Sequence, residues 1–530
     1  MRSKLRILVL LLPALVLAAC AGLPPGADYP KQASVAFADP GDTAMGRQFD
    51  SAAELHAGES AFRILTVGTD GFAARMEMIA AAERSLDLQY FIYHSDDTGR
   101  LITNALLAAA DRGVHVRLLL DDGQTVAGDE QVVALAAHPR IEIRFFNPFA
   151  YRGHHLLLRG FEFVFNARRL DYRMHNKLII ADNAASLIGG RNIGDQYFQV
   201  DPGSQFADDD IFVAGPAVRK LSESFDAFWN SALAIPAQAL AYGKQTQAQL
   251  DARRAALAEQ QRKAQDAGVD YLLRAESGEP LSGIEQGELP LVWAGAQVVW
   301  DSPEKKRVQE GSMSGRLMYE PVARVAAAVQ NELIMITPYF VPTAAEMKLI
   351  DDLRRRNVRV RILTSSLAGT TELFAHSGYM HYRRRLLDDG VELYEVRPML
   401  GSTRGSGQTA AISRAGNYGL HAKLFVFDRQ RLFAGSMNFD QRSTRLNTEV
   451  GLIIDSPELA QQTATRFEAM TQPASAYHVI LKPGRTGRLH EVWQTEEQGK
   501  TVEYTTEPSR SVWKRIATWI LWLFPLQKEL

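Results

Sequence analysis

The chain of 530 residues contains a single cysteine, Cys20, so it can form neither an internal disulfide nor a metal site built from several cysteines. It also lacks an excess of charge of either sign. The formal net charge is −2 at pH 7, which argues against the broad basic surface of a nucleic-acid-binding protein. The apolar run near the C-terminus, residues 512–524, is too short to span a bilayer. We therefore expect no disulfide scaffold, no cysteine metal centre and no nucleic acid partner.

The one cysteine ends a segment that is typical of a secretory signal. Basic residues precede an apolar stretch at 7–16, and the letters LAAC at 17–20 resemble the lipobox of bacterial lipoproteins, whose cysteine is lipidated. We predict a lipoprotein signal peptide over 1–20 with Cys20 as the lipidation site; an ordinary cleaved signal and an uncleaved anchor are the alternatives. Ala21 resembles the outer-membrane-directed class, so we expect a membrane-anchored protein on the periplasmic side, at the outer membrane rather than the inner one.

The length suggests two domains, or one pseudo-symmetric pair, because a single core rarely serves so long a chain. Residues 21–53 are rich in Pro, Gly and Ala without sustained periodicity, which is typical of a tether. Order is expected to begin near Glu54.

The remainder of the chain is organised around one motif that occurs twice. The pattern H-x-K-x4-D-x6-G-[GS]-x-N begins at His175 and again at His421, without an insertion in either copy. Its spacing predicts a β-hairpin. Histidine and lysine two residues apart lie on one face of a strand, an apolar run continues that strand, and Asp182 or Asp428 stands where the chain turns. Two matches indicate an internal duplication.

The hairpin register follows from the position of the turn. In the first copy, pairing around 182–183 puts His175 opposite about Arg191 and Lys177 opposite about Gly189, and Asn192 returns beside the histidine. Each hairpin thus gathers an imidazole, an ammonium and an amide at one end, which makes half of a site.

In the second copy His421 faces about Met437 by the same arithmetic, with Lys423 on the same face and Asn438 close by. Small residues follow the second strand of both hairpins, and we expect them to let a ligand approach the backbone. These candidate substrate-binding positions are Gly190, Gly435 and Ser436.

Helical and strand patterns alternate around each hairpin, which predicts an α/β fold with a sheet flanked by helices in each repeat. In the first repeat, 54–231, we expect helices over 72–82 and 99–112 and strands over 85–93, 114–120 and 141–146. In the second repeat, 301–470, we expect helices over 322–330, 344–356 and 457–470 and strands over 333–341, 358–363 and 391–396.

Two further segments complete the organisation. Residues 232–300 are expected to form an inter-repeat helix and a crossover, with 280–295 as a loop. The tail, 471–530, becomes basic and aromatic. Its 512–526 segment holds three tryptophans and a Lys-Arg pair, so it could lie in the lipid headgroup region or dock on the body as a helix, and the sequence leaves both open.

The duplicated motif resembles the phospholipase D superfamily. The letters GGRN in the first copy, GSMN and NTEVG in the second, the lipobox and the Trp-rich end resemble its cardiolipin synthase C branch. The resemblance implies two pseudo-symmetric repeats with a mixed sheet each and a single site at their interface. It also implies a covalent phosphohistidine formed without a metal or another cofactor.

The resemblance also implies residue roles. His175 is the nucleophile and His421 the general acid and base. A histidine titrates near neutrality, which suits both tasks. Asp182 and Asp428 fall at the turns, so we expect them to be structural. The residues expected to hold the phosphoryl group are Lys177, Lys423, Asn192 and Asn438.

Carboxylates that orient the two histidines are expected after the hairpins. The superfamily has an acidic residue there that Glu449 matches. Comparing 206–213 with 446–453 points to Asp208 in the first half, with Asp210 as the second choice. Because Ser436 is replaced by Gly190 in the first copy, the halves are not chemically equivalent.

The expected activity is transfer of a phosphatidyl group between membrane phospholipids, giving cardiolipin from phosphatidylglycerol and a second lipid such as phosphatidylethanolamine. Hydrolysis by the same site is the alternative. A nuclease is disfavoured by the neutral charge and membrane attachment. A non-catalytic lipid-binding scaffold is disfavoured by two intact histidine–lysine pairs.

Overall fold

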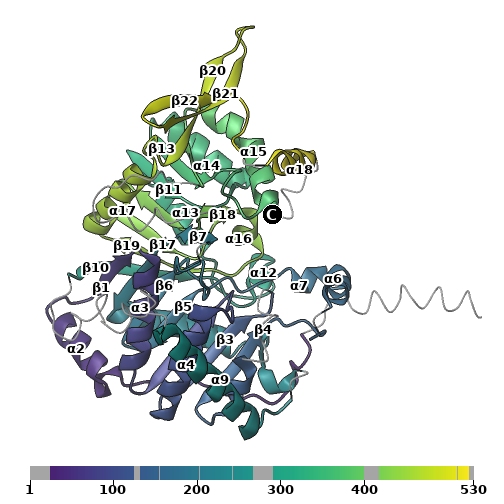
Figure 1. Ribbon diagram of the computed structural model, residues 1–530. Coiled ribbons are helices and arrows are strands. Elements are labelled where there is room, and N and C mark those ends of the chain that lie inside the picture. Colours follow the sequence, from purple (N-terminus) through teal and green to yellow (C-terminus); the bar gives the residue numbers. More distant parts are fainter. Residues whose placement is uncertain are drawn as a thin grey trace, which may run out of the picture.

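The computed structural model describes residues 24–123, 132–153, 155–201, 203–240, 243–266, 290–398, 417–509 and 511–523. Two α/β halves lie one above the other, the N-terminal half in purple to teal and the C-terminal half in green to yellow (Figure 1). Each half has a mixed β-sheet flanked by helices, which confirms the predicted fold class. The signal segment with Cys20 lies outside the described residues.

The first half is built on a sheet whose central strands are parallel and whose hairpin strands are antiparallel. Across the sheet the order is β9 (Ala234–Pro236), β4 (Ile141–Phe146), β3 (His115–Asp121), β2 (Ser85–Tyr90), β5 (Leu178–Ala181), β6 (Ala185–Gly189), β8 (Asp210–Ala214) and β1 (Ser60–Leu65). The principal helices are α3 (Gly68–Ala81), α4 (Asp97–Asp111) and α8 (Pro216–Trp229).

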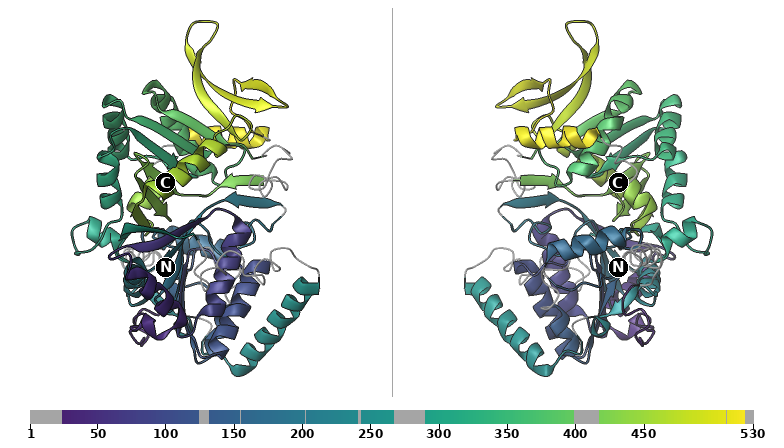
Figure 2. Two further views of the ribbon diagram at one scale, coloured as in Figure 1. Left: turned by 90° about the vertical axis from the view of Figure 1, so that its left-hand side faces the viewer. Right: turned by 90° about the vertical axis from the view of Figure 1, so that its right-hand side faces the viewer.

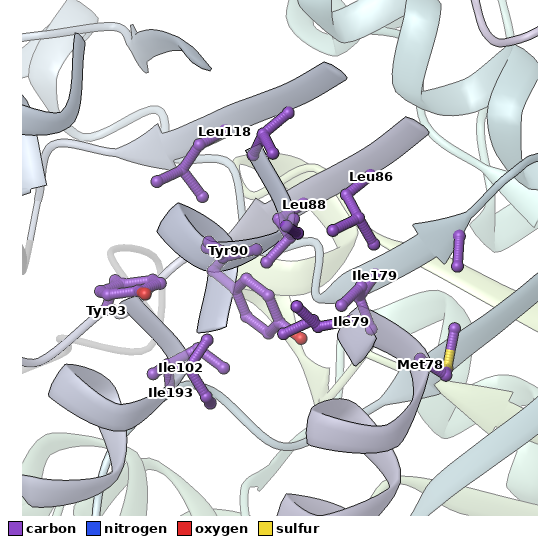
Figure 3. Close-up of a cluster of buried hydrophobic side chains, with 14 of the residues drawn as sticks. Met78, Ile79, Leu86, Leu88, Tyr90, Tyr93, Ile102, Leu118, Ile179 and Ile193 are labelled. Atoms are coloured by element: carbon purple, nitrogen blue, oxygen red, sulfur yellow. The ribbon is translucent and has the colours of Figure 1, made fainter. Parts of the chain in front are cut away.

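The core of the first half forms where apolar side chains of α3, β2, α4 and β3 converge (Figure 3). Alternate residues of β2 point into it, since successive side chains of a strand face opposite ways. Leu86, Leu88 and Tyr90 are each fully buried there. Burying a side chain of this size stabilises the fold by roughly 1.5–3 kcal/mol.

The second half repeats this plan with one extension. The strand order is β19 (Val450–Asp455), β17 (Arg431–Gly435), β16 (Leu424–Phe427), β11 (Glu332–Ile336), β13 (Arg359–Ser365), β14 (Glu392–Val396), β20 (Ala476–Pro483), β21 (Leu489–Glu497) and β22 (Lys500–Tyr504). The principal helices are α13 (Tyr319–Ala327), α14 (Ala344–Arg355), α15 (Leu373–Asp388) and α17 (Pro457–Met470).

Local signals explain where several of these helices begin. α17 starts after Ser456, whose side chain accepts a hydrogen bond from the Leu459 N–H, and proline occupies the first helical position. α14 starts with a capping box between Thr343 and Glu346. Both helices match the ranges expected from the sequence to within one residue.

One strand joins the two halves into a continuous sheet. β10 (Val292–Trp300) pairs with β1 through Ser60 opposite Ala294, and with β19 through Gly295 opposite Asp455. The expectation of a loop over 280–295 is wrong for its last four residues. Glycine and alanine give this segment a loop-like composition. It nevertheless forms a strand, because it pairs with the edge strands of both sheets and so provides hydrogen-bond partners for their backbone groups.

The tether expected over 21–53 also differs from the structure. α2 (Ala44–Ala53) is helical, and the preceding segment is held to the first repeat: the Lys31 ammonium donates to the carbonyl oxygens of Ser231 and Ala234, and the Ala36 N–H donates to Asp226. Order therefore begins well before Glu54. The contacts of Lys31 and Ala36 use backbone groups and polar side chains, so no hydrophobic periodicity reveals them.

Some of the C-terminal segment, 471–530, belongs to the second repeat. β20 pairs with β14, so the sheet continues past the boundary expected at 470. α18 (Val512–Trp522) lies against α15, where the Trp522 ring stacks on His381 at 5.2 Å. Among the described residues no helix is both long and apolar enough to cross a membrane.

Between the repeats, α9 (Gln247–Asp266) falls within the inter-repeat helix expected from the sequence and packs along α4. The residues of the expected crossover beyond 266 lie outside the described range as far as 289.

Candidate active site

Both motif hairpins have the register that their spacing predicts. Leu178 pairs with Ile188 and Leu424 with Ala434, and continuing that register places His175 opposite Arg191. The turns need two successive residues with positive φ, as in a type I′ hairpin. Asp182 and Asn183 have φ of 53° and 52°, and the second hairpin repeats this at 428–429.

The motif aspartates tie each turn to the strand beside it. Asp182 accepts hydrogen bonds from the backbone N–H groups of residues 83, 84 and 85, at 2.8–2.9 Å. Asp428 does the same for residues 330, 331 and 332. Each aspartate thus anchors its hairpin at the end remote from the histidine.

We expect Asp182→Ala to lower the free energy of unfolding by about 3 kcal/mol, because three N–H groups lose an ionised acceptor. Urea denaturation followed by circular dichroism would measure the loss, with the exposed Asp42→Ala as control. A variant that unfolds like the wild type but has lost activity would contradict this structural role.

The two halves meet along short strands that lie outside the motif hairpins. β7 (Ser204–Ala207) pairs in parallel with β15 (Asn417–Leu420), and the His421 N–H donates to the Ala207 carbonyl oxygen at 2.8 Å. Symmetrically, the His175 N–H donates to the Thr448 carbonyl oxygen at 2.9 Å. Each histidine is therefore hydrogen-bonded to the residue that precedes a carboxylate of the opposite half.

This crossing brings each imidazole onto a buried carboxylate. His175 Nδ1 lies 2.9 Å from Glu449 Oε2, and His421 Nδ1 lies 2.5 Å from Asp208 Oδ2. The partners are 274 and 213 residues apart in the chain. Both carboxylates are fully buried, and the imidazoles are 7% exposed. Since Nδ1 is engaged, Nε2 is the remaining nitrogen of each ring.

The motif lysines lie at the same place. Lys177 and Lys423 are each 1% exposed, and each ammonium donates to the carbonyl oxygen of the histidine two residues before it, at 2.5 Å. Lys177 also lies over the ring of Phe91, 5.3 Å from its centroid, and that ring meets His175 edge-on at 5.0 Å. Two ammonium groups, two imidazoles and two carboxylates are thus gathered between the repeats.

Comparison with known proteins places this geometry in a family. The family model described as "Cardiolipin synthase, PLD-like domain" matches residues 76–229 and 323–471, which contain both hairpins. The chain belongs to this phospholipase D-like family. It is 36% identical over 480 residues to cardiolipin synthase C of Escherichia coli (strain K12), covering 89% of this chain and 96% of that relative.

Two further comparisons agree. An uncharacterised protein of Helicobacter pylori (strain ATCC 700392 / 26695) is 28% identical over 488 residues, covering 90% of this chain and 91% of that protein. The crystal structure of phosphatidylserine synthase from Haemophilus influenzae Rd KW20 aligns with a TM-score of 0.50 at 14% identity, covering 81% of this chain and 92% of that one, which shows a shared fold. Family membership makes the chain a phospholipid-modifying enzyme.

Burial shapes the titration of the histidines in this phospholipase D-like site. It holds the pKa of His175 well below the usual value, and the charges of Lys177 and Lys423 add to the effect. Burial and Lys423 lower the pKa of His421 to about 3, although Asp208 opposes them. Both imidazoles therefore favour the neutral form before a substrate charge arrives.

The pKa values of the two carboxylates shift in opposite directions. Burial raises the pKa of Glu449, with Lys177 opposing it. Burial acts the same way on Asp208, but His421 and Lys423 outweigh it and lower the pKa. Asp208 therefore stays ionised more readily than Glu449, so the two histidines have unequal environments.

The two asparagines of the motif, Asn192 and Asn438, are buried. The Asn192 side-chain oxygen accepts a hydrogen bond from the Ile92 N–H at 3.1 Å, and the same side chain is hydrogen-bonded to Tyr197. The Asn438 N–H donates to Ser443, and its side-chain oxygen has no hydrogen-bond partner among the described residues.

The sequence suggested that Gly190, Gly435 and Ser436 leave room for a ligand, but the structure shows that they do not. A Cβ atom at Gly190 would lie 2.1 Å from a carboxylate oxygen of Asp208, and one at Gly435 would lie 2.5 Å from the Val450 carbonyl oxygen. The Ser436 hydroxyl donates to Glu449 at 2.5 Å. These positions accommodate the carboxylates and the adjoining strand rather than a phosphate.

Asp210, the second choice for the carboxylate of the first half, is engaged elsewhere. It forms buried ion pairs with Arg75 at 2.7 Å and with Arg191 at 3.0 Å. Arg191 also donates to the carbonyl oxygen of Asp208. Asp210 therefore fixes the backbone from which Asp208 projects.

Sequence reasoning missed the groups that support Glu449. Its N–H donates to Asp301 at 3.0 Å, and Asp301 pairs with the buried Lys305 at 2.9 Å. Ser443 donates to Glu449 Oε1 at 2.8 Å. An acid and a base four residues apart after a strand are too common to have revealed this role.

It also missed Asp121, whose carboxylate accepts the Met174 N–H at 2.8 Å and so fixes the residue before His175. A signal was present, because Asp121 ends a buried parallel strand, where functional residues of α/β folds gather.

Proposed function

We propose that the chain is a phosphatidyltransferase that forms a covalent phosphohistidine and passes the phosphatidyl group to a hydroxyl of a second phospholipid. Cardiolipin made from phosphatidylglycerol and a second lipid such as phosphatidylethanolamine is the proposed product. The observation that carries the proposal is the crossed pairing of the two histidines with Glu449 and Asp208. The 36% identity to a cardiolipin synthase C supports the choice of product.

In the first step, His175 Nε2 attacks phosphorus. The P–N bond forms as the P–O bond to the headgroup breaks, and His421 gives its proton to the departing oxygen. In the second step, the acceptor hydroxyl gives its proton to His421 and its oxygen attacks phosphorus. The P–N bond then breaks, and both histidines return to their starting forms.

The unequal carboxylates support these roles. A nucleophile must be neutral, and the pKa of His175 is well below its usual value because of burial. A general acid must carry a proton, and an ionised Asp208 stabilises an imidazolium at His421. A phosphodiester brings one negative charge between two lysines, which offsets their effect and favours that protonation.

Lys177, Lys423, Asn192 and Asn438 are proposed to stabilise the charge that grows on the non-bridging oxygens. Each of these side chains is buried, and an electrostatic contact is stronger in a buried site than in water. Four such donors give the site a means of charge neutralisation from the chain alone.

Membrane attachment is proposed to come from a lipidated Cys20, with the 512–526 segment as a second contact. The site would then act on the leaflet that faces the periplasm, at the outer membrane. Attachment raises the local concentration of enzyme at its lipid substrate.

The test is product analysis. The full-length chain, reconstituted in vesicles of phosphatidylglycerol alone and with phosphatidylethanolamine, is incubated and its lipids are identified by mass spectrometry. Cardiolipin as the main product supports transfer. Phosphatidic acid as the main product would instead establish hydrolysis, the alternative reaction of the same site. No turnover by the wild type with either vesicle would count against both.

We expect a chelator to leave the activity unchanged, because the proposed charge stabilisation comes from side chains. The measurement is turnover of the same vesicles with and without EDTA. Activity that disappears with EDTA and returns with one divalent ion would contradict the metal-independent mechanism.

A further inference from the structure

Helix α6 (Leu156–Phe165) has its amphipathic pattern reversed. Its charged residues hold it to the body: Arg159 donates to the Asp122 carbonyl oxygen, and Glu162 accepts the N–H groups of residues 150 and 151 at 2.7 and 2.8 Å. A helix on a water-facing surface normally turns its apolar stripe inward. Here large apolar side chains face outward with exposed fractions of 39–80%: Leu157, Leu158, Phe161, Phe163, Val164 and Phe165.

Helix α18 is reversed in the same way. Its inward side carries Thr518, which is 1% exposed, and Lys514, whose ammonium donates to the Thr370 carbonyl oxygen at 2.9 Å. Its outward side, with the residue that follows the helix, shows six large apolar side chains with exposed fractions of 42–79%: Val512, Trp513, Ile516, Trp519, Ile520 and Leu523.

The two helices come from opposite halves yet lie on the same side of the molecule. Both are at the right in Figure 1, and both face the viewer in the right-hand panel of Figure 2. The expectations of docking and of membrane contact for the tail therefore describe two faces of one helix. Its inner face packs on the body, and its outer face is exposed.

Each helix is also linked to the catalytic region. α6 leads through α7 (Ala167–Leu170) to Asp171, which lies four residues before His175. Asp171 forms an ion pair with Arg442 at 2.6 Å. On the other side, the loop that accepts the Lys514 ammonium includes Thr371, which is hydrogen-bonded to the Tyr339 hydroxyl. The charge of Arg442 acts on His175, and Tyr339 interacts with Tyr197, whose ring meets His421 edge-on at 5.2 Å. A surface bound by both helices would therefore lie against segments that border the site.

We propose that α6 and α18 form one membrane-docking face that inserts its apolar side chains into the headgroup region of a single leaflet. This inference rests on the proposed function, because it supplies the reason for a lipid surface. Three observations favour a bilayer as the occupant. Tryptophans are enriched at membrane interfaces. Arg168 of α7 is exposed, and α18 contains no acidic residue, which suits anionic lipid. Neither helix is long enough to span.

Local depth tests the proposal directly. In full-length chain with Cys20→Ser, a single thiol at Phe161→Cys or Ile516→Cys is labelled with an environment-sensitive fluorophore and mixed with phosphatidylglycerol–phosphatidylethanolamine vesicles. Both probes are expected to shift to the blue and to be quenched by nitroxide-labelled lipid. A probe at Leu55→Cys is the control and should not respond, because this exposed residue comes two positions after α2, and α2 lies on the opposite side of the molecule in Figure 1.

A Phe161 probe that stays aqueous on vesicles overturns the proposal. A blue shift that needs protein concentration rather than lipid would also overturn it, and would assign the face to a second copy of the chain.

A second measurement separates docking from catalysis. The double variant Phe161→Glu, Val164→Glu is expected to lose about tenfold in turnover of phosphatidylglycerol vesicles, because two apolar contacts with lipid are lost. Its turnover of monomeric, short-chain phosphatidylglycerol should match the wild type, and Leu55→Glu should be normal on both. Equal losses on both substrates, or none on vesicles, would refute the docking face. If the wild type turned over neither substrate, the proposed function would fail, while the probes would still decide the docking question.

Discussion

Replacing His175 by alanine is expected to abolish turnover, a loss of at least ~10³-fold, because the proposed covalent intermediate forms on the imidazole of His175. The neutral imidazole is held by Glu449 with Nε2 as its remaining nitrogen, and alanine removes the attacking atom while leaving the carboxylate and lysines in place. The measurement is cardiolipin formation in vesicles. His490→Ala, on the distant β21, is the control. Wild-type activity of His175→Ala would eliminate the covalent mechanism.

Comparing His175→Ala with His421→Ala can identify the nucleophile if the headgroup of the lipid substrate is replaced. With a p-nitrophenyl leaving group, the departing oxygen needs no proton, so His421→Ala should still release one equivalent of nitrophenol in a burst. His175→Ala should release none. The reverse result would exchange the roles of the two histidines.

Glu449→Gln is expected to lower kcat by about 10³-fold with a small change in KM, because an amide can donate to His175 Nδ1 and so favour the wrong tautomer. The hydroxyls of Ser436 and Ser443 donate to this carboxylate, and their geometry would also change. Steady-state kinetics on vesicles measures the effect. The exposed Glu458→Gln is the control.

Stability separates this role from a structural one. Burial raises the pKa of Glu449, so the folded state binds its proton more tightly than the unfolded state, and at neutral pH the ionised carboxylate costs stability. A neutral glutamine removes that cost. The thermal midpoint of Glu449→Gln should therefore not fall. A large fall together with the lost activity would mean that Glu449 holds the fold rather than the imidazole.

The sequence alone determined the fold class and the internal geometry of each hairpin. Side chains two apart share a face, turn residues set the centre of pairing, and β5 and β6 are adjacent in the chain, so the register is a local matter. The helix limits at Pro457 and Met470 were predictable for the same reason, since caps act within one turn.

The tertiary structure decided what lies beside each hairpin. Glu449 and His175 are 274 residues apart, and no local rule states that the repeats exchange their carboxylates. The space at Gly190 was expected for a ligand, but packing gives it to Asp208. The pattern of α6 marks an apolar stripe without saying whether the stripe faces the core or the outside. Contacts between distant segments depend on how whole elements pack, which local propensity does not encode.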